Sequence, residues 1–328
     1  MSSAITDRPP PAVVAHGSPP RRASRLPAGL RVPILIVLNL GIQVALSTFA
    51  ADVLPKDVAL ASSKATSDYD AAARFVYQIL MVWLGWHLKY DFIDVGALTL
   101  IADAPYAYLV RTYYDVSLTS IITRIHIDLA AIMIPTYLLR PRSALHNPHA
   151  PLRNRFLLNS VQVQAATGLL AVGVYVVVLW SALKTHLLNP FLVTHFQLVT
   201  LEHAHNETPI QLIWKTAIAG LAAQTFLLYP SITSQPSSGA VTPVRLFDSA
   251  TATLPETLQH NVWFFSKRTK TLVQQTVILC AFLFANTVRR ASGLEGADLV
   301  GAAGYAGLWV LATVICAGWW VWVGDTEA

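Results

Sequence analysis

Long apolar stretches alternate with polar segments along most of the chain, and this pattern predicts membrane-spanning helices. A bilayer core about 30 Å thick needs roughly 20 mostly apolar residues in a helix. Several stretches reach that length, and the basic residues cluster in the segments beside them. The predicted spans are 32–51, 73–90, 92–111, 116–139, 156–183, 210–232, 271–290 and 303–323. The sequence therefore predicts an all-α, polytopic transmembrane helix bundle of about eight spans, with seven to nine as the range.

The second and third predicted spans leave an alternative open. Lys89, Asp91 and Asp94 interrupt the apolar pattern, and Pro105 lies inside the third span. The two stretches could instead form one kinked helix, or a re-entrant pair shielded from lipid by protein.

Composition agrees with a lipid environment. Hydrophobic residues make up 54% of the 328 positions and charged residues only 12%, whereas soluble domains average about 25% charged residues. The net charge of +5 does not indicate nucleic acid, because the basic residues lie beside apolar spans, where they orient the chain. Cys280 and Cys316 both fall inside apolar spans and are predicted to be packing residues.

Lysine and arginine in the connecting segments predict the orientation of the chain. With eight spans, most of these cations fall on the side that holds both termini, which places that side in the cytosol. The predicted organisation is a disordered cytosolic tail over 1–30 and a bundle over 31–323 with a short cytosolic tail over 324–328. Residues 184–209 form a lumenal connection and residues 233–270 a cytosolic loop. Within that loop, Pro255 begins an aromatic and basic stretch that is typical of an interfacial helix.

A glycosylation pattern agrees with this orientation. Asn206-Glu207-Thr208 has the acceptor form and lies in the connection assigned to the lumen. The endoplasmic reticulum or a connected endomembrane is the predicted location. A mitochondrial membrane is the alternative, because the first 30 residues are rich in arginine and serine, although their prolines disfavour the amphipathic helix of a presequence.

Ionisable residues inside the predicted spans are the candidate functional residues. Asp103 lies in the third span, and Arg124, His126 and Asp128 lie in the fourth. Arg124 and Asp128 share a helix face, whereas His126 points elsewhere. If the two spans fold as a hairpin, Asp103 and Arg124 lie at the same depth, which predicts that they pair. Such groups usually face the bundle interior and mark substrate or ion pathways.

Two interpretations of this cluster remain open, because it could brace two helices or handle a substrate or proton. Three functional classes follow: a non-enzymatic membrane component, a transporter of a small solute or protons, and a membrane-embedded enzyme acting on a lipid-like substrate. An acyl or prenyl transferase or a cyclase would be such an enzyme. The catalytic candidates are Asp103, Arg124, His126 and Asp128, with Asp103 or His126 as the acid or base.

The sequence indicates no cofactor and no metal site. His203 and His205 lie beside Glu202, but a one-residue spacing brings two histidines to one face only in a strand. Phosphate-binding loops, nucleophile motifs and paired cysteines are absent from the sequence. The predicted partners are therefore the lipid bilayer and a lipid-like or other small molecule.

Overall fold

The computed structural model describes residues 27–53, 68–148, 155–234 and 266–325, together with positions 150, 152, 253 and 254. This part of the chain is mostly helical and contains no strand. The helices are η1 (Ala28–Leu30), α1 (Arg31–Val53), α3 (Asp68–His87), α4 (Phe92–Tyr113), α5 (Leu118–Leu139), α6 (Arg155–Asn159), α7 (Val161–Lys184), α8 (Leu188–His195), α9 (Glu202–His205), α10 (Pro209–Ala223), η2 (Gln224–Leu228), α11 (Tyr229–Thr233), α13 (Lys267–Ala291) and α14 (Leu299–Asp325).

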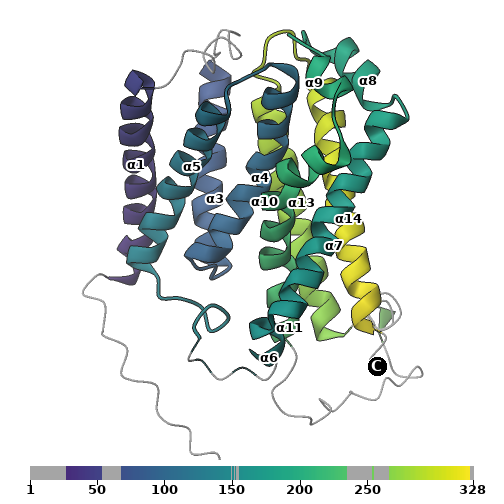
Figure 1. Ribbon diagram of the computed structural model, residues 1–328. Helices are drawn as coiled ribbons and strands as arrows, with labels where there is room; N and C mark the ends of the chain where they lie inside the picture. Colours follow the sequence, from purple (N-terminus) through teal and green to yellow (C-terminus); the bar gives the residue numbers. More distant parts are fainter. Residues whose placement is uncertain are drawn as a thin grey trace, which may run out of the picture.

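The long helices run alternately up and down through one bundle (Figure 1). Helix α1 begins, and α14 ends, at the lower end of that view, whereas α8 and α9 lie at the upper end. Helices α10, η2 and α11 follow one another without a break and form one continuous helix through the bundle, in which η2 is a short stretch of π-helix. The prediction of a polytopic helical bundle is confirmed.

Seven of the described helices are long and apolar enough to cross a membrane: α1, α4, α5, α7, α10–α11, α13 and α14. Helix α3, the eighth long helix, has 20 residues and packs on α1 and α13. It ends in a tight turn in which Lys89 has a left-handed φ of 61°. Spans two and three are therefore separate helices, and the chain reverses between them.

Local hydrogen bonds explain why α4 and α5 begin where they do. The Asp91 carboxylate accepts hydrogen bonds from the amides of Ile93 and Asp94, and the Asp94 carboxylate accepts one from the Asp91 amide, which completes a capping box. Ser117 caps α5 by accepting the amide of Ser120. The short connection between these helices places the middle of α4 beside the middle of α5.

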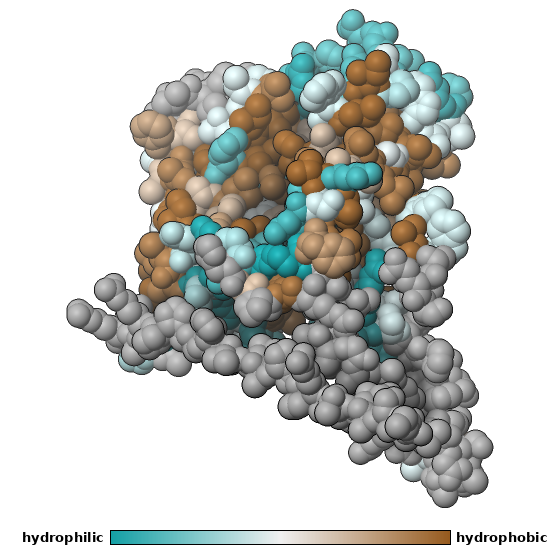
Figure 2. Space-filling model, turned by 60° about the horizontal axis from the view of Figure 1, so that its bottom comes forward, coloured by the Kyte–Doolittle hydropathy of each residue, from teal (hydrophilic) through white to brown (hydrophobic). Residues whose placement is uncertain are grey.

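The outside of the bundle is apolar, and many polar residues lie inside. Figure 2 shows apolar residues over much of the coloured surface, with hydrophilic residues gathered near its middle and at one end. This arrangement suits a molecule whose helices face hydrocarbon. Exposed large apolar side chains include Val37, Val44, Phe49, Leu169, Val177, Trp214, Ile218, Val277, Leu311 and Val314. Buried polar side chains include Asn39, Asp103, Asp128, Gln224, Asn286 and Thr313.

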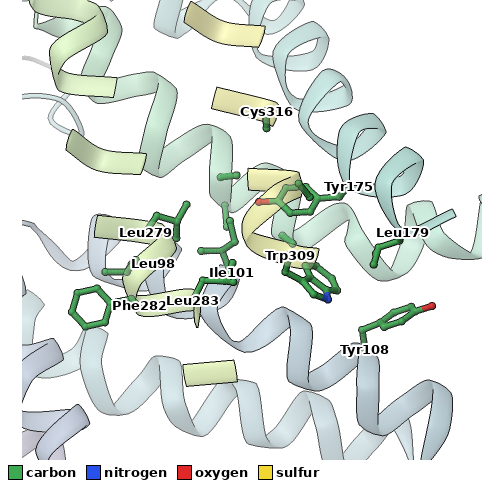
Figure 3. Close-up of a cluster of buried hydrophobic side chains, with 14 of the residues drawn as sticks. Leu98, Ile101, Tyr108, Tyr175, Leu179, Leu279, Phe282, Leu283, Trp309 and Cys316 are labelled. Carbon is green, nitrogen blue, oxygen red and sulfur yellow. The ribbon is translucent and has the colours of Figure 1, made fainter. Parts of the chain in front are cut away.

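The apolar core lies where α4, α7, α13 and α14 meet (Figure 3). Trp309 of α14 is fully buried, and its ring meets those of Tyr108 and Tyr175 at centroid distances of 6.0 and 5.8 Å. Tyr175 hydrogen-bonds Thr313 at 2.7 Å, and Tyr305 donates to the carbonyl of Pro105 at 2.6 Å. The Tyr175 and Tyr305 hydroxyls therefore find partners on neighbouring helices, whereas the Tyr108 hydroxyl and Trp309 Nε1 have none among the described residues. Cys316 is buried in the same core.

Some sequence predictions concern residues outside the described part of the chain. These are most of the tail over 1–30, most of the loop over 233–270 with its interfacial helix, and the last three residues of the segment over 324–328. Residues 184–209 are described and contain α8 and α9.

Candidate functional site

One arginine of α13 joins two buried aspartates from different helices. The guanidinium of Arg290 lies 2.5 Å from Asp128 Oδ2 of α5 and 3.2 Å from Asp103 Oδ1 of α4. All three side chains are nearly buried, with 12%, 7% and 4% of their surface exposed, respectively. Since an unpaired charge in hydrocarbon is very unfavourable, this bridge holds three helices at one depth.

Asn286, one turn earlier on α13, positions the bridge. Its amide nitrogen donates to Asp103 Oδ1 at 2.7 Å and to the Ala102 carbonyl at 2.9 Å. Its amide oxygen accepts from Arg289 at 2.7 Å and from Arg290 at 3.2 Å. The other oxygen of Asp103, Oδ2, is buried and has no hydrogen-bond partner among the described residues.

Arg124 and Gln43 complete the surroundings of Asp128. Arg124 lies on the same face of α5 and approaches Asp128 Oδ2 at 3.3 Å, but 44% of its side chain is exposed. Gln43 of α1 donates to Asp128 Oδ1 at 3.1 Å. The amides of Gln78 and Asn39 continue this network, because Gln78 donates to both Asn39 and Gln43. Helices α1, α3, α4, α5 and α13 therefore meet through polar side chains.

These side chains surround a cavity of about 180 Å³, which is large enough for several waters or a small solute. Three arginines, two aspartates and four side-chain amides line it, beside Tyr77, whose ring lies under the Arg289 guanidinium at 5.0 Å. The charged and amide residues are Arg124, Arg289, Arg290, Asp103, Asp128, Asn39, Gln43, Gln78 and Asn286.

A second, narrower cavity of about 30 Å³ lies on the other side of the same charges. Arg124, Asp103 and Arg290 line both cavities. Along α5, the large cavity reaches Ala131 and Ile132, towards the lower end in Figure 1, whereas the small one reaches Ser120 and Ile121, towards the upper end. The charged cluster thus separates two hollow regions that extend towards opposite ends of the bundle.

The structure places the candidate residues in different surroundings. Asp103, Arg124 and Asp128 line the large cavity. His126 is exposed on α5, and its Nδ1 lies 2.8 Å from the Ile122 carbonyl of its own helix. Asp103 makes its ion pair with Arg290, and none with Arg124 among the described residues.

Arg290 and Asn286 are functional candidates that the sequence interpretation missed. Arg289 and Arg290 stand at the end of the predicted span 271–290, where basic residues are typical of the membrane surface and do not stand out as functional candidates. The available signal was Asn286, a polar residue three and four positions before the two arginines and therefore on their face of the helix.

The histidines near the upper end find protein partners. His203 Nε2 lies 3.1 Å from Asp115, and His205 Nδ1 lies 2.9 Å from the Leu201 carbonyl. Among the described residues, the group whose ligand atoms lie close enough together for a metal is Asp91, Asp94 and His146, at the opposite end of α4.

Comparisons with known proteins give no independent assignment of this cavity or of its charged residues. Searches of protein-family models, of curated proteins and of solved structures find no match to this chain.

Proposed function

We propose that this integral membrane protein binds a small polar solute in the large cavity and passes it across the bilayer through the Asp103–Arg290–Asp128 bridge. The observation that carries this proposal is the pair of cavities that share Arg124, Asp103 and Arg290 as their common wall. A purely structural brace needs no space on either side of it. Intramembrane charges that line cavities are characteristic of substrate and ion pathways.

The charge of the lining favours a solute that carries a negative group. Three guanidinium groups face two carboxylates, so the large cavity has a surplus of one positive charge when both aspartates are ionised. Arginine binds carboxylate and phosphate groups with paired N–H donors. The four amide side chains offer both donors and acceptors for the polar remainder of such a solute.

A membrane-embedded enzyme is the second candidate, and one atom favours it. Asp103 Oδ2 is buried without a hydrogen-bond partner among the described residues, in a side chain that lines both cavities. A carboxylate oxygen in that position can accept a proton from a bound substrate. An enzyme needs access to the site from one side only, whereas a transporter needs access from both sides.

Thiol accessibility tests these alternatives. In a background in which Cys280 and Cys316 are replaced by alanine, Gln43→Cys places a thiol at the large cavity and Ser120→Cys places one at the small cavity. We expect a membrane-impermeant methanethiosulfonate to modify Gln43→Cys from one side of sealed vesicles and Ser120→Cys from the other side. Labelling of both thiols from the same side would favour the enzyme function. Protection of both thiols would exclude both functions and leave a purely structural role for the charged cluster.

Thr313→Cys is the matched control for this experiment. Thr313 is as fully buried as Ser120 but packs against Tyr175 in the apolar core, away from both cavities. It should stay unmodified from either side. Modification of this thiol would show that the reagent also reaches the apolar core, so that labelling of the other two thiols would not demonstrate access through the cavities.

We further propose that both termini face the cytosol and that the protein resides in the endoplasmic reticulum or a connected endomembrane. The loop charges support this orientation, and Asn206 is exposed at the upper end, opposite the start of α1. In eukaryotic cells, a glycosidase should lower the mass of the wild type but not that of Asn206→Gln. A tag at residue 240 should react from the cytosol, and a protected tag would overturn the orientation.

A further inference from the structure

A second polar cluster lies at the lower end of α4, outside the cavity described above. Nδ1 of His146 lies 2.8 Å from Asp91 Oδ2 and 4.0 Å from Asp94 Oδ1. One imidazole nitrogen and two carboxylate oxygens therefore lie within 4.8 Å of one another. The three side chains are at least nine-tenths buried, with 9%, 1% and 8% of the surface of His146, Asp91 and Asp94 exposed, respectively.

Local structure holds these ligand atoms in place. Asp91 and Asp94 are fixed by the capping box at the start of α4. The amide of Ser143 donates to Asp91 Oδ2 at 3.0 Å, and Ser143 Oγ lies 3.3 Å from His146 Nδ1, which fixes the segment after α5 against that helix start. Burial alone would raise the pKa of Asp91, but the hydrogen bonds from His146 and the Ser143 amide outweigh burial and lower it.

The cluster has more negative than positive charge. Among the described residues, no lysine or arginine forms an ion pair with Asp91 or Asp94, and His146 is their only basic partner. The nearby guanidinium of Arg140 interacts electrostatically with both carboxylates, but its N–H groups donate to the backbone carbonyls of Gly85, Trp86 and Tyr90. Two buried carboxylates beside one imidazole leave room for a divalent cation to balance the charge.

An unused ligand atom points to the same conclusion. Asp94 Oδ2 accepts the Asp91 amide, but Oδ1 has no hydrogen bond from any described residue. Asp94 and Ser143 also line a cavity of about 200 Å³, which Tyr90, Phe226 and Gln275 bound on its other sides. An ion held by three protein ligands would thus have space beside it for water in its remaining coordination positions.

We propose that Asp91, Asp94 and His146 bind a divalent first-row transition metal ion, with zinc as the reference ion. One imidazole and two carboxylates are a ligand set that zinc accepts, and ions of this class share a preference for nitrogen and oxygen donors. The ion would tie the start of α4 to the segment after α5. This site is independent of the proposed solute pathway, because the large cavity is lined by none of its residues.

Zinc binding by the full-length protein in detergent tests the proposal. For this measurement, the protein is prepared without a histidine tag, bound metal is removed with a chelator, and the protein is then titrated with Zn²⁺. We expect one equivalent to bind to the wild type, and His146→Gln and Asp94→Asn to weaken binding at least tenfold. Asn at 94 can still accept the Asp91 amide, so the helix cap is retained. His203→Ala, which removes an exposed histidine at the opposite end, should bind zinc as the wild type does.

Two further results separate metal binding from loss of folding. Bound Co²⁺ should give the wild type a visible d–d absorption that added Zn²⁺ abolishes, and this measurement needs no variant. Zn²⁺ should also raise the melting temperature of the wild type and of His203→Ala, but not that of His146→Gln. No zinc bound to the wild type, or equal affinity in the wild type and His146→Gln, would overturn the proposal.

Discussion

Arg290→Gln is expected to destabilise the protein by about 3–5 kcal/mol, because it leaves two buried carboxylates without their shared cation. Arg290 contacts Asp103 and Asp128 at once and is only 12% exposed. Arg124→Gln is the matched control. Arg124 pairs with Asp128 alone, and Asp128 keeps Arg290 as its partner when Arg124 is lost, so the loss should cost about 1 kcal/mol, the contribution of one hydrogen bond. Unfolding in detergent, followed by tryptophan fluorescence, measures both free energies.

The double variant Asp103→Asn with Arg290→Gln makes this expectation more specific. Arg290→Gln leaves Asp103 without a cation, and Asp103→Asn removes one of the two carboxylates that Arg290 binds, whereas the double change removes both members of this pair. The double variant should therefore lose less stability than the sum of the two single variants. Additive losses, or equal losses for Arg290→Gln and Arg124→Gln, would show that Arg290 does not form the bridge described here.

Gly220→Ala is expected to cost about 3 kcal/mol, because α7 and α10 touch through their backbones at this residue. A Cβ atom at Gly220 would lie 2.7 Å from the amide nitrogen and 2.9 Å from the Cα of Val172. Backbone atoms cannot rotate away as a side chain can, so the two helices would have to separate. Small residues at such crossings are the usual way for membrane helices to pack closely. The melting temperature in detergent should fall accordingly.

Gly173→Ala is the control for that substitution. Gly173 lies beside Val172 on α7, but a Cβ there meets nothing within 4 Å. Since alanine also favours the helix by about 1 kcal/mol over glycine, this variant should be as stable as the wild type or more so. A similar loss at both positions would mean that the crossing is not set by Gly220.

The local sequence contains much of the information about the spans, because hydrocarbon imposes a length and an apolar composition on each helix separately. Predicted spans such as 92–111 and 116–139 agree closely with α4 and α5. The second and third spans were the least certain, because Lys89, Asp91 and Asp94 interrupt the apolar pattern, and the turn at Lys89 is what separates α3 from α4.

The candidate site was predictable only in part. Asp103, Arg124 and Asp128 stand out in the sequence because charges are rare inside apolar spans. Their partners do not stand out, because Arg290 follows Asp128 by 162 residues and is the last residue of a predicted span, a position expected at the membrane surface. Asp91 and His146 are likewise 55 residues apart and meet only when α4 and the segment after α5 come together.

The amino-acid pattern alone was enough to identify a bundle of membrane-spanning helices and to single out Asp103, Arg124 and Asp128 as charges inside the spans. It could do so because helix formation and exclusion from water depend on neighbouring residues and on the solvent. Only the packing of separate helices brings Arg290 between Asp103 and Asp128 and leaves cavities beside this bridge. Pairing and empty space depend on how separate helices pack, and no local pattern along one helix specifies which face of another it will meet.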